Sequence, residues 1–279
     1  MAGECPLHND TKKILNIGQV DFINCLPINL PIELGEIDIN AKIIKAVPSE
    51  LNRKILSGEI DIAPVSSYAY ITNKDKLTPI ADLCIASNGP ADSVLLFSQL
   101  PIEELDGAKI ALSSASATSN KLLEIILKEF LNVKHCRGEV TSPLQSDNFP
   151  ARLLIGDHAL FEFSQMPRNI FIYDLGSLWK KHTGLPMVFG MWVARKDIVE
   201  KYPDEIQIIS SQLRKSKQIG LTTAFDKVVK KAQEKVLISK EFYSTYFQHL
   251  SYDFTEEHKK GLEAFEKYCQ IVDKVTVKT

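Results

Sequence analysis

The 279-residue sequence lacks an excess of charge of one sign, because 33 lysines and arginines face 35 aspartates and glutamates. Such a balance does not favour nucleic acid or an anionic membrane as a partner. Neither a membrane-spanning apolar run nor a signal-peptide core is visible in the sequence. We therefore expect a cytoplasmic protein, and nothing in the pattern indicates its oligomeric state.

Motifs for metal, phosphate or covalent chemistry are also missing. The 5 cysteines are scattered and never form Cys-x-x-Cys, and the 6 histidines form no His-x-x-x-His pair. No Gly-x-Ser-x-Gly elbow, phosphate loop or dinucleotide fingerprint occurs. The sequence therefore predicts reduced thiols, no metal site and no cofactor.

What is present is an alternation of strands and helices. A strand at 14–20 runs into a polar turn, and a strand at 41–47 leads to a helix that Ser49 is expected to cap and Gly58 to end. The strand 61–65 follows at once. This β-α-β unit predicts a mainly parallel sheet with helices on its faces.

A second β/α unit starts near residue 108, and two apolar strands, 93–98 and 187–194, are expected to cross between the units. Residues 196–279 show helical spacing of apolar residues and are expected to be all helix. We predict an α/β protein of two lobes, the first made of 1–98 and 191–279 and the second of 99–190. Small ligands usually bind in the cleft between such lobes.

Polar side chains at strand ends are the candidate ligand contacts. Asn24 follows the first strand and either caps its own turn or presents an uncharged amide to a ligand. Ser66 follows the strand 61–65 and either caps the next helix or binds a carboxylate there. Ser87 and Ser93 flank the turn before the crossing strand, where each is a turn residue or a ligand contact.

The run from Ser113 to Asn120 contains six hydroxyl or amide side chains between a strand and a helix. One helix cap needs only one of them, so the excess favours an anion-binding cradle that includes Ser116, Thr118 and Ser119. Asp157, after the strand 151–155, either orients a substrate hydroxyl or caps a turn.

Six segments in this order cover most of residues 14–195. They are IGQVDFINCLPI (17–28), VPSELNRKILSGEIDIAPVSSYAY (47–70), CIASNGPADSVLLFS (84–98), SSASATSNKLLEIIL (113–127), LIGDHAL (154–160) and YDLGSLWKKHTGLPMVFGMWVAR (173–195). Together they resemble the chorismate dehydratases of the futalosine route to menaquinone, within a wider group that includes dihydroxynaphthoate synthase. The resemblance implies the periplasmic-binding-protein type II fold and the loss of water from chorismate to give 3-[(1-carboxyvinyl)oxy]benzoate.

The resemblance also implies roles for particular residues. The functional asparagine and serine of the family fall on Asn24 and on Ser93 or Ser87, and spacing favours Ser93. The carboxylate contacts fall on Ser66, Thr118 and Ser119. In this family the enolpyruvyl carboxylate of the substrate is thought to act as the base. The first motif departs from the common Tyr-Leu-Asn-Thr-x-Pro-Leu, because Cys25 stands at the threonine position.

Two other functions compete with this one. A dihydroxynaphthoate synthase of the same group uses a histidine base, for which His158 is the best-placed residue. A non-catalytic protein that binds a small anion is natural for the fold, but the absence of an export signal argues against it.

Overall fold

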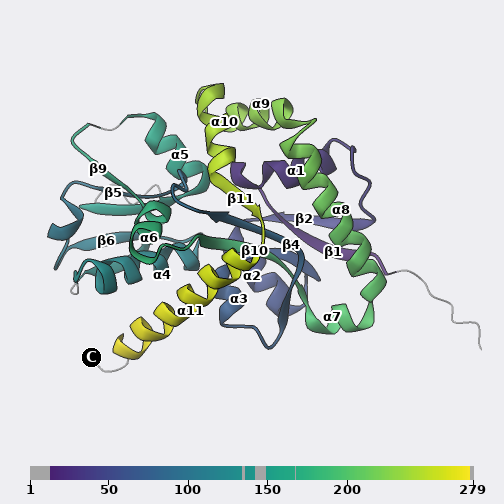
Figure 1. Cartoon of the computed structure of the whole chain (residues 1–279), viewed down its shortest axis with the longest axis horizontal. Coiled ribbons are helices and arrows are strands. Elements are labelled where there is room, and N and C mark those ends of the chain that lie inside the picture. Colours follow the sequence, from purple (N-terminus) through teal and green to yellow (C-terminus); the bar gives the residue numbers. More distant parts are fainter. Residues whose placement is uncertain (1–12, 134–135, 142–148, 167, 277–279) are drawn as a thin grey trace, which may run out of the picture.

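The computed structural model describes residues 13–133, 136–141, 149–166 and 168–276, and their strands form two separate sheets (Figure 1). The first sheet has the order β11-β4-β10-β3-β1-β2 and the second the order β7-β6-β8-β5-β9. The strands are β1 (Leu15–Val20), β2 (Ala41–Ala46), β3 (Ile62–Ser66), β4 (Leu77–Ser87), β5 (Val94–Ser98), β6 (Lys109–Ser113), β7 (Arg137–Thr141), β8 (Ala151–Ile155), β9 (Phe171–Asp174), β10 (Met187–Arg195) and β11 (Leu250–Asp253).

Helices cover both sheets, and we call each sheet with its helices a lobe. The helices of the first two thirds are η1 (Ile23–Cys25), α1 (Leu26–Glu33), α2 (Pro48–Ser57), α3 (Ser67–Ile71), η2 (Ile102–Glu104), α4 (Ala117–Ile125), the π-helical η3 (Ile126–Phe130), α5 (Gly156–Ser164) and α6 (Leu175–Thr183). Those of the last third are α7 (Lys196–Lys201), α8 (Pro203–Leu221), α9 (Phe225–Lys235), α10 (Lys240–His249) and α11 (Glu256–Thr276).

The expected β-α-β unit is present as β1, β2, α2 and β3, with β1 parallel to both β2 and β3. Helix α2 ends at Gly58 in the left-handed conformation, as predicted, but Val47 precedes the first turn and Pro48 occupies its start. Ser49 is therefore not the cap. The polar turn expected at 24–27 consists instead of the end of η1 and the first two residues of α1, where Pro27 is compatible with the first turn of a helix.

The sheets are mixed rather than mainly parallel. In the first sheet β10 runs antiparallel to β3 and β4, and in the second β5 runs antiparallel to β8 and β9. Strand β5 thus lies wholly in the second sheet, and the crossing falls in residues 88–93 before it. We therefore propose that the second lobe begins within residues 88–93 and ends within residues 184–186, whereas the sequence predicted limits after residues 98 and 190.

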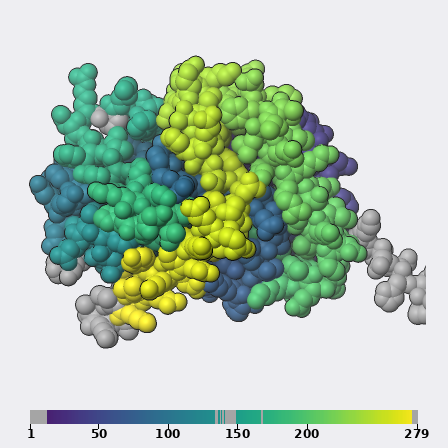
Figure 2. Space-filling view, viewed as in Figure 1, coloured from purple at the N-terminus to yellow at the C-terminus, as the bar shows by residue number. Residues whose placement is uncertain are grey.

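The C-terminal third is helical except for β11, which pairs with the edge of β4 and corrects the expectation of an all-helical segment. Helix α11 packs against β10, α3 and α4, so that it contacts both lobes. Its residues Phe265, Cys269 and Val272 belong to the apolar core of the second lobe. Figure 2 shows this segment in yellow across the front of the molecule. Within the described ranges no helix is long and apolar enough to cross a membrane.

Helix α8 fixes the position of α1, which follows the Asn24 turn directly. The Ser216 hydroxyl donates to the Ile28 carbonyl at 2.6 Å, and a Cβ added to Gly220 would lie 1.9 Å from the Pro27 carbonyl oxygen. Two backbones approach this closely only because position 220 has no side chain.

We expect Gly220→Ala to lower the free energy of unfolding by about 1–3 kcal/mol, because the overpacking outweighs the higher helix propensity of alanine. Urea denaturation measures the change. Ser211→Ala, on the exposed face of the same helix, is the control and should change stability little. Equal stability of the Gly220→Ala variant and the wild type would contradict the close approach.

Candidate active site

A cavity lies between the two sheets and is lined from both lobes. Its walls include Phe22, Pro64 and Gly190 from the first lobe and Val94 and Ile155 from the second. Five of the eight predicted site residues line it, namely Asn24, Ser66, Ser93, Ser116 and Ser119. Asn24 and Ser119, which are 95 positions apart in the sequence, thus line the same cavity.

Asn24 lines this cavity and carries an unpaired acceptor. Its Oδ1 atom is buried and has no hydrogen-bond partner among the described residues. The backbone around it is fixed, because Ile23 N donates to Asp157 at 2.8 Å and the Asn24 carbonyl accepts from the Tyr252 hydroxyl at 2.9 Å. A buried acceptor without a donor costs free energy unless a ligand supplies one.

Ser93 stands where the chain enters β5. Its side chain is 2% exposed, and its Oγ lies 2.9 Å from the Tyr246 hydroxyl and 3.3 Å from the Ala91 carbonyl oxygen. The turn before it is clamped by Asp174, whose carboxylate accepts from the backbone N–H groups of Ala91 and Asp92. Ser93 is therefore held in place by its backbone as well as by its side chain.

Three serines at helix starts supply hydroxyl groups. Ser116 caps α4 by accepting from Ser119 N at 3.1 Å, and the Oγ atoms of these two serines are 2.9 Å apart. One proton serves that contact, which leaves the other hydroxyl proton for a ligand. Ser66 caps α3 and accepts from Asn52 Nδ2 at 3.2 Å, so its own proton is also available to a ligand.

The other three predicted residues lie outside the cavity lining and use their polar atoms elsewhere. Ser87 donates to the Gly89 carbonyl at 2.9 Å, and the Thr118 hydroxyl accepts from Tyr68 N at 2.9 Å. Asp157 binds Ile23 N and the ammonium group of Lys235. The roles of Ser87, Thr118 and Asp157 as substrate contacts therefore stay predictions that the cavity lining does not support. In the structure, Thr118 and Asp157 connect the two lobes.

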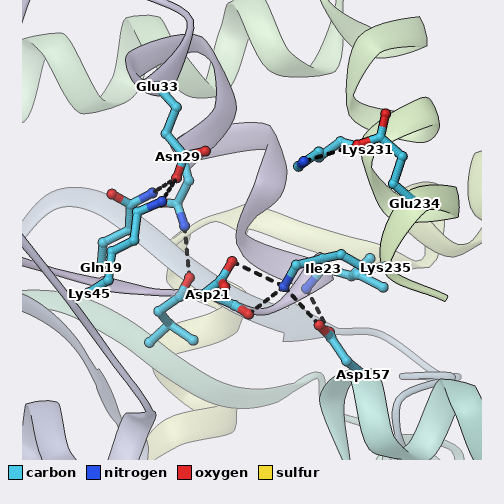
Figure 3. Close-up of polar contacts among 11 residues, drawn as sticks. Gln19, Asp21, Ile23, Asn29, Glu33, Lys45, Asp157, Lys231, Glu234 and Lys235 are labelled. Carbon is cyan, nitrogen blue, oxygen red and sulfur yellow. Dashed lines mark hydrogen bonds and ion pairs between the residues drawn. The ribbon is translucent and has the colours of Figure 1, made fainter.

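The Asp157 contacts are drawn in Figure 3, where its carboxylate lies between Lys235 and the turn that carries Ile23. Lys235 Nζ is 2.9 Å from Asp157 Oδ2 and 3.0 Å from Asp21 Oδ1. Asp157 belongs to α5 of the second lobe, whereas Asp21 and Lys235 belong to the first. The carboxylate thus links the lobes and fixes the residue next to Asn24.

Cys25 also lines the cavity, at the position where the resembling family commonly has threonine. Burial, reinforced by the negative charge of Asp157, raises the pKa of its thiol to about 12. At neutral pH the group is a neutral thiol, which is a weak hydrogen-bond donor and a poor base.

Sequence analysis did not identify Tyr246, Tyr252 and Lys235, all of which contact the site residues or their supports. The spacing of Phe242, Tyr246 and Leu250 predicted a partly apolar helix face, although Leu250 begins β11 in the structure, so the sequence pattern indicated core packing alone. The polar partner of the Tyr246 hydroxyl, Ser93, is 153 positions away in the sequence. The residues around Tyr246 therefore could not indicate this contact.

Two α/β lobes, with a cavity between them and a chain that passes twice from one to the other, define the class of periplasmic-binding-protein-like folds. Solved structures agree. A protein of Archaeoglobus fulgidus superposes with a TM-score of 0.73 at 15% identity, covering 93% of this chain and 97% of that one. The periplasmic aliphatic sulphonate binding protein of Escherichia coli superposes with a TM-score of 0.64 at 14% identity, covering 95% and 88%. The predicted fold class is confirmed.

The chain belongs to the menaquinone biosynthesis family, whose sequence pattern it matches over residues 15–270. It is 31% identical to the chorismate dehydratase of Thermus thermophilus, over 80% of this chain and 85% of the relative. The Campylobacter jejuni chorismate dehydratase is 28% identical over 67% and 73%, and the 1,4-dihydroxy-6-naphthoate synthase of Thermus thermophilus is 25% identical over 76% and 77%. The resemblance found in the sequence is confirmed.

The link through Asp157 can be tested by substitution. We expect Asp157→Ala to lower the free energy of unfolding by about 2–3 kcal/mol, because it leaves Ile23 N and a half-buried lysine without this partner. Asp157→Asn keeps an acceptor for Ile23 N and should lose less. Chemical denaturation measures both variants.

Asp226→Ala is the control, because it removes an aspartate from an exposed ion pair with Lys240. Such pairs contribute little, so its stability should be nearly unchanged. If Asp157→Ala were as stable as this control, Asp157 would not join the lobes in solution.

Proposed function

We propose that the protein is a chorismate dehydratase of menaquinone biosynthesis, a hydro-lyase that converts chorismate to 3-[(1-carboxyvinyl)oxy]benzoate and water. The observation that carries this proposal is the unpaired, buried Oδ1 of Asn24 in a cavity whose other polar side chains are hydroxyls and one neutral thiol. The two relatives named chorismate dehydratase support the same substrate.

The reaction breaks one C–H bond and the neighbouring C–OH bond of the chorismate ring. A base takes the proton of the C–H bond, whose electron pair becomes part of the aromatic ring, and the departing hydroxide then receives this proton from the base to give water. Because aromatisation drives the elimination, the protein mainly has to position the substrate and stabilise charge on the departing oxygen. Positioning alone can supply about 7–11 kcal/mol of barrier lowering.

The hydroxyls at the helix starts suit the two carboxylates of chorismate. Ser116 and Ser119 stand at the first turn of α4, where a free hydroxyl proton and the positive end of the helix dipole favour an anion. Ser66 offers a further hydroxyl on the opposite lobe. We assign carboxylate binding to these three residues.

Asn24 and Ser93 suit the leaving hydroxyl group. The Asn24 Oδ1 accepts a hydrogen bond from this hydroxyl and orients it, while Ser93 donates a hydrogen bond to the hydroxyl oxygen as its bond to carbon lengthens. A donor aimed at developing negative charge acts mainly in the transition state. These two residues are the proposed catalytic residues.

The base in this proposal is the enolpyruvyl carboxylate of the substrate. Among the lining residues that the structure describes there is no histidine, aspartate, glutamate or lysine, and the pKa of Cys25 is far above neutrality. A carboxylate of the substrate itself can remove the C–H proton, so that the reaction does not require a basic side chain of the protein.

The naphthoate synthase alternative is less well supported by this cavity. His158, the candidate base for that reaction, is exposed on α5 and does not line the cavity. A binding protein without catalysis would share the cavity but would form no aromatic product.

The direct test incubates purified protein with chorismate and follows ultraviolet absorbance and mass. We expect a product lighter than chorismate by one water and with a benzoate spectrum. Chorismate that binds and is recovered unchanged would favour the non-catalytic alternative.

Substitutions separate the roles of the site residues. We expect Asn24→Ala and Ser93→Ala each to lower kcat by about 100-fold or more with a small change in KM, because both act on the departing hydroxyl. Ser116→Ala and Ser119→Ala should mainly raise KM. Steady-state kinetics measure both parameters, and an unchanged kcat in both Asn24→Ala and Ser93→Ala would remove these two residues from the mechanism.

A further inference from the structure

Two buried tyrosines of the C-terminal segment contact the two proposed catalytic residues. Tyr246 on α10 places its hydroxyl 2.9 Å from Ser93 Oγ, and Tyr252 on β11 donates to the Asn24 carbonyl at 2.9 Å. Their side chains are 1% and 3% exposed. They are six positions apart in the sequence, yet each reaches a different residue of the cavity.

The direction of the Tyr246–Ser93 hydrogen bond follows from counting protons. Each hydroxyl has one proton, and Ser93 Oγ has a second acceptor within reach, the Ala91 carbonyl oxygen at 3.3 Å. Tyr246 has no other partner among the described residues, so if Ser93 donated to it the phenol proton would be buried and unused. A buried donor without an acceptor is costly, and Tyr246 is therefore the donor.

This direction decides what Ser93 can do. Because the Ser93 oxygen accepts the hydrogen bond from Tyr246, the hydroxyl proton of Ser93 stays available for donation. The Ala91 contact is long, so the proton can turn from that carbonyl to a ligand oxygen in the cavity without loss of the Tyr246 bond. In such a chain each hydrogen bond polarises the next, which makes Ser93 a better donor.

Tyr252 acts on the other catalytic residue through its backbone. The backbone is held on both sides of Asn24. The Tyr252 hydroxyl donates to the Asn24 carbonyl, and the Asp157 carboxylate accepts from the N–H group of Ile23. These contacts come from different parts of the chain, and together they fix the backbone that carries the Asn24 side chain. Asn24 is thus preorganised before a ligand arrives.

We propose that Tyr246 and Tyr252 are positioning residues of this site: Tyr246 makes Ser93 a hydrogen-bond donor toward the substrate, and Tyr252 holds the Asn24 peptide that aims its amide. The kinetic part of this inference rests on the proposed function, whereas the geometric part does not.

Burial supports the role of both phenols. It raises the pKa of Tyr246 and of Tyr252 well above the usual value, so both keep their protons throughout the physiological range. They donate hydrogen bonds without taking part in proton exchange.

The kinetic test compares three tyrosine-to-phenylalanine variants assayed with chorismate. We expect Tyr246→Phe and Tyr252→Phe to lower kcat by about 10-fold to 100-fold while KM changes less than about threefold. Tyr243→Phe is the matched control, since Tyr243 is buried on the same helix as Tyr246 and its hydroxyl donates at 2.7 Å to the Val236 carbonyl. It should lose stability similarly but keep kcat.

A double substitution tests whether Tyr246 acts through Ser93. In the Ser93→Ala background, the further change Tyr246→Phe should leave kcat within about twofold, because the hydroxyl that it positions is already gone. Equal kcat losses in Tyr246→Phe and the Tyr243→Phe control, or an undiminished effect of Tyr246→Phe without Ser93, would overturn the role of Tyr246. A wild-type kcat in Tyr252→Phe would overturn that of Tyr252.

Crystal structures of the same variants decide the geometric part without any turnover. In Tyr246→Phe we expect the Ser93 hydroxyl to rotate away from the cavity, and in Tyr252→Phe we expect the Asn24 amide to lose its single orientation. Unmoved side chains in both would overturn the inference. If the wild type binds but does not convert chorismate, the proposed function fails, and these structures still test the two tyrosines.

Discussion

The hydrogen bond from Ile23 N to the Asp157 carboxylate joins the two lobes at the residue next to Asn24. A cavity between two lobes has fixed geometry only while the lobes keep one relative position. This bond, the pairing of Asp157 with Lys235, and the bond from Tyr68 N to Thr118 all cross the interface. They use residues on α4 and α5, the same helices whose first turns border the cavity. The contacts that join the lobes and those that shape the site are therefore adjacent.

The charged groups of this interface stay outside the cavity. Lys235 pairs with the carboxylates of Asp157 and Asp21 behind the Asn24 turn, and the polar side chains that line the cavity are an amide, hydroxyls and a thiol. For the proposed substrate, which carries two carboxylates, this separation has a physical advantage. A carboxylate in the lining would repel the ligand, whereas a lysine would hold the substrate carboxylate that the proposed mechanism needs as a base. Neutral donors bind the anion without suppressing its basicity to the same degree.

Sequence periodicity was sufficient for most strands and helices, with β11 as an exception, because alternating and helical spacing are local properties. The positions of Asn24, Ser66, Ser93, Ser116 and Ser119 at strand ends and helix starts also predicted that they would meet. Local pattern could not tell which hydroxyls turn inward: Thr118 and Ser119 are neighbours, yet Thr118 binds Tyr68 N and Ser119 lines the cavity. The errors at β5 and β11 have the same origin, since strand pairing is decided by partners distant in the chain.

Helix α11 ties the far end of the chain to this arrangement. It packs on β10 of the first lobe, while Phe265 lies edge-on to Trp179 of the second, with ring centroids 6.1 Å apart. Any widening of the gap between the lobes must therefore slide or detach this helix from one of its two supports. The opening that admits a ligand is thus coupled to a buried aromatic contact outside the cavity lining. Substitutions at Phe265 or Trp179 are therefore expected to alter the rate of ligand exchange although neither residue lines the cavity.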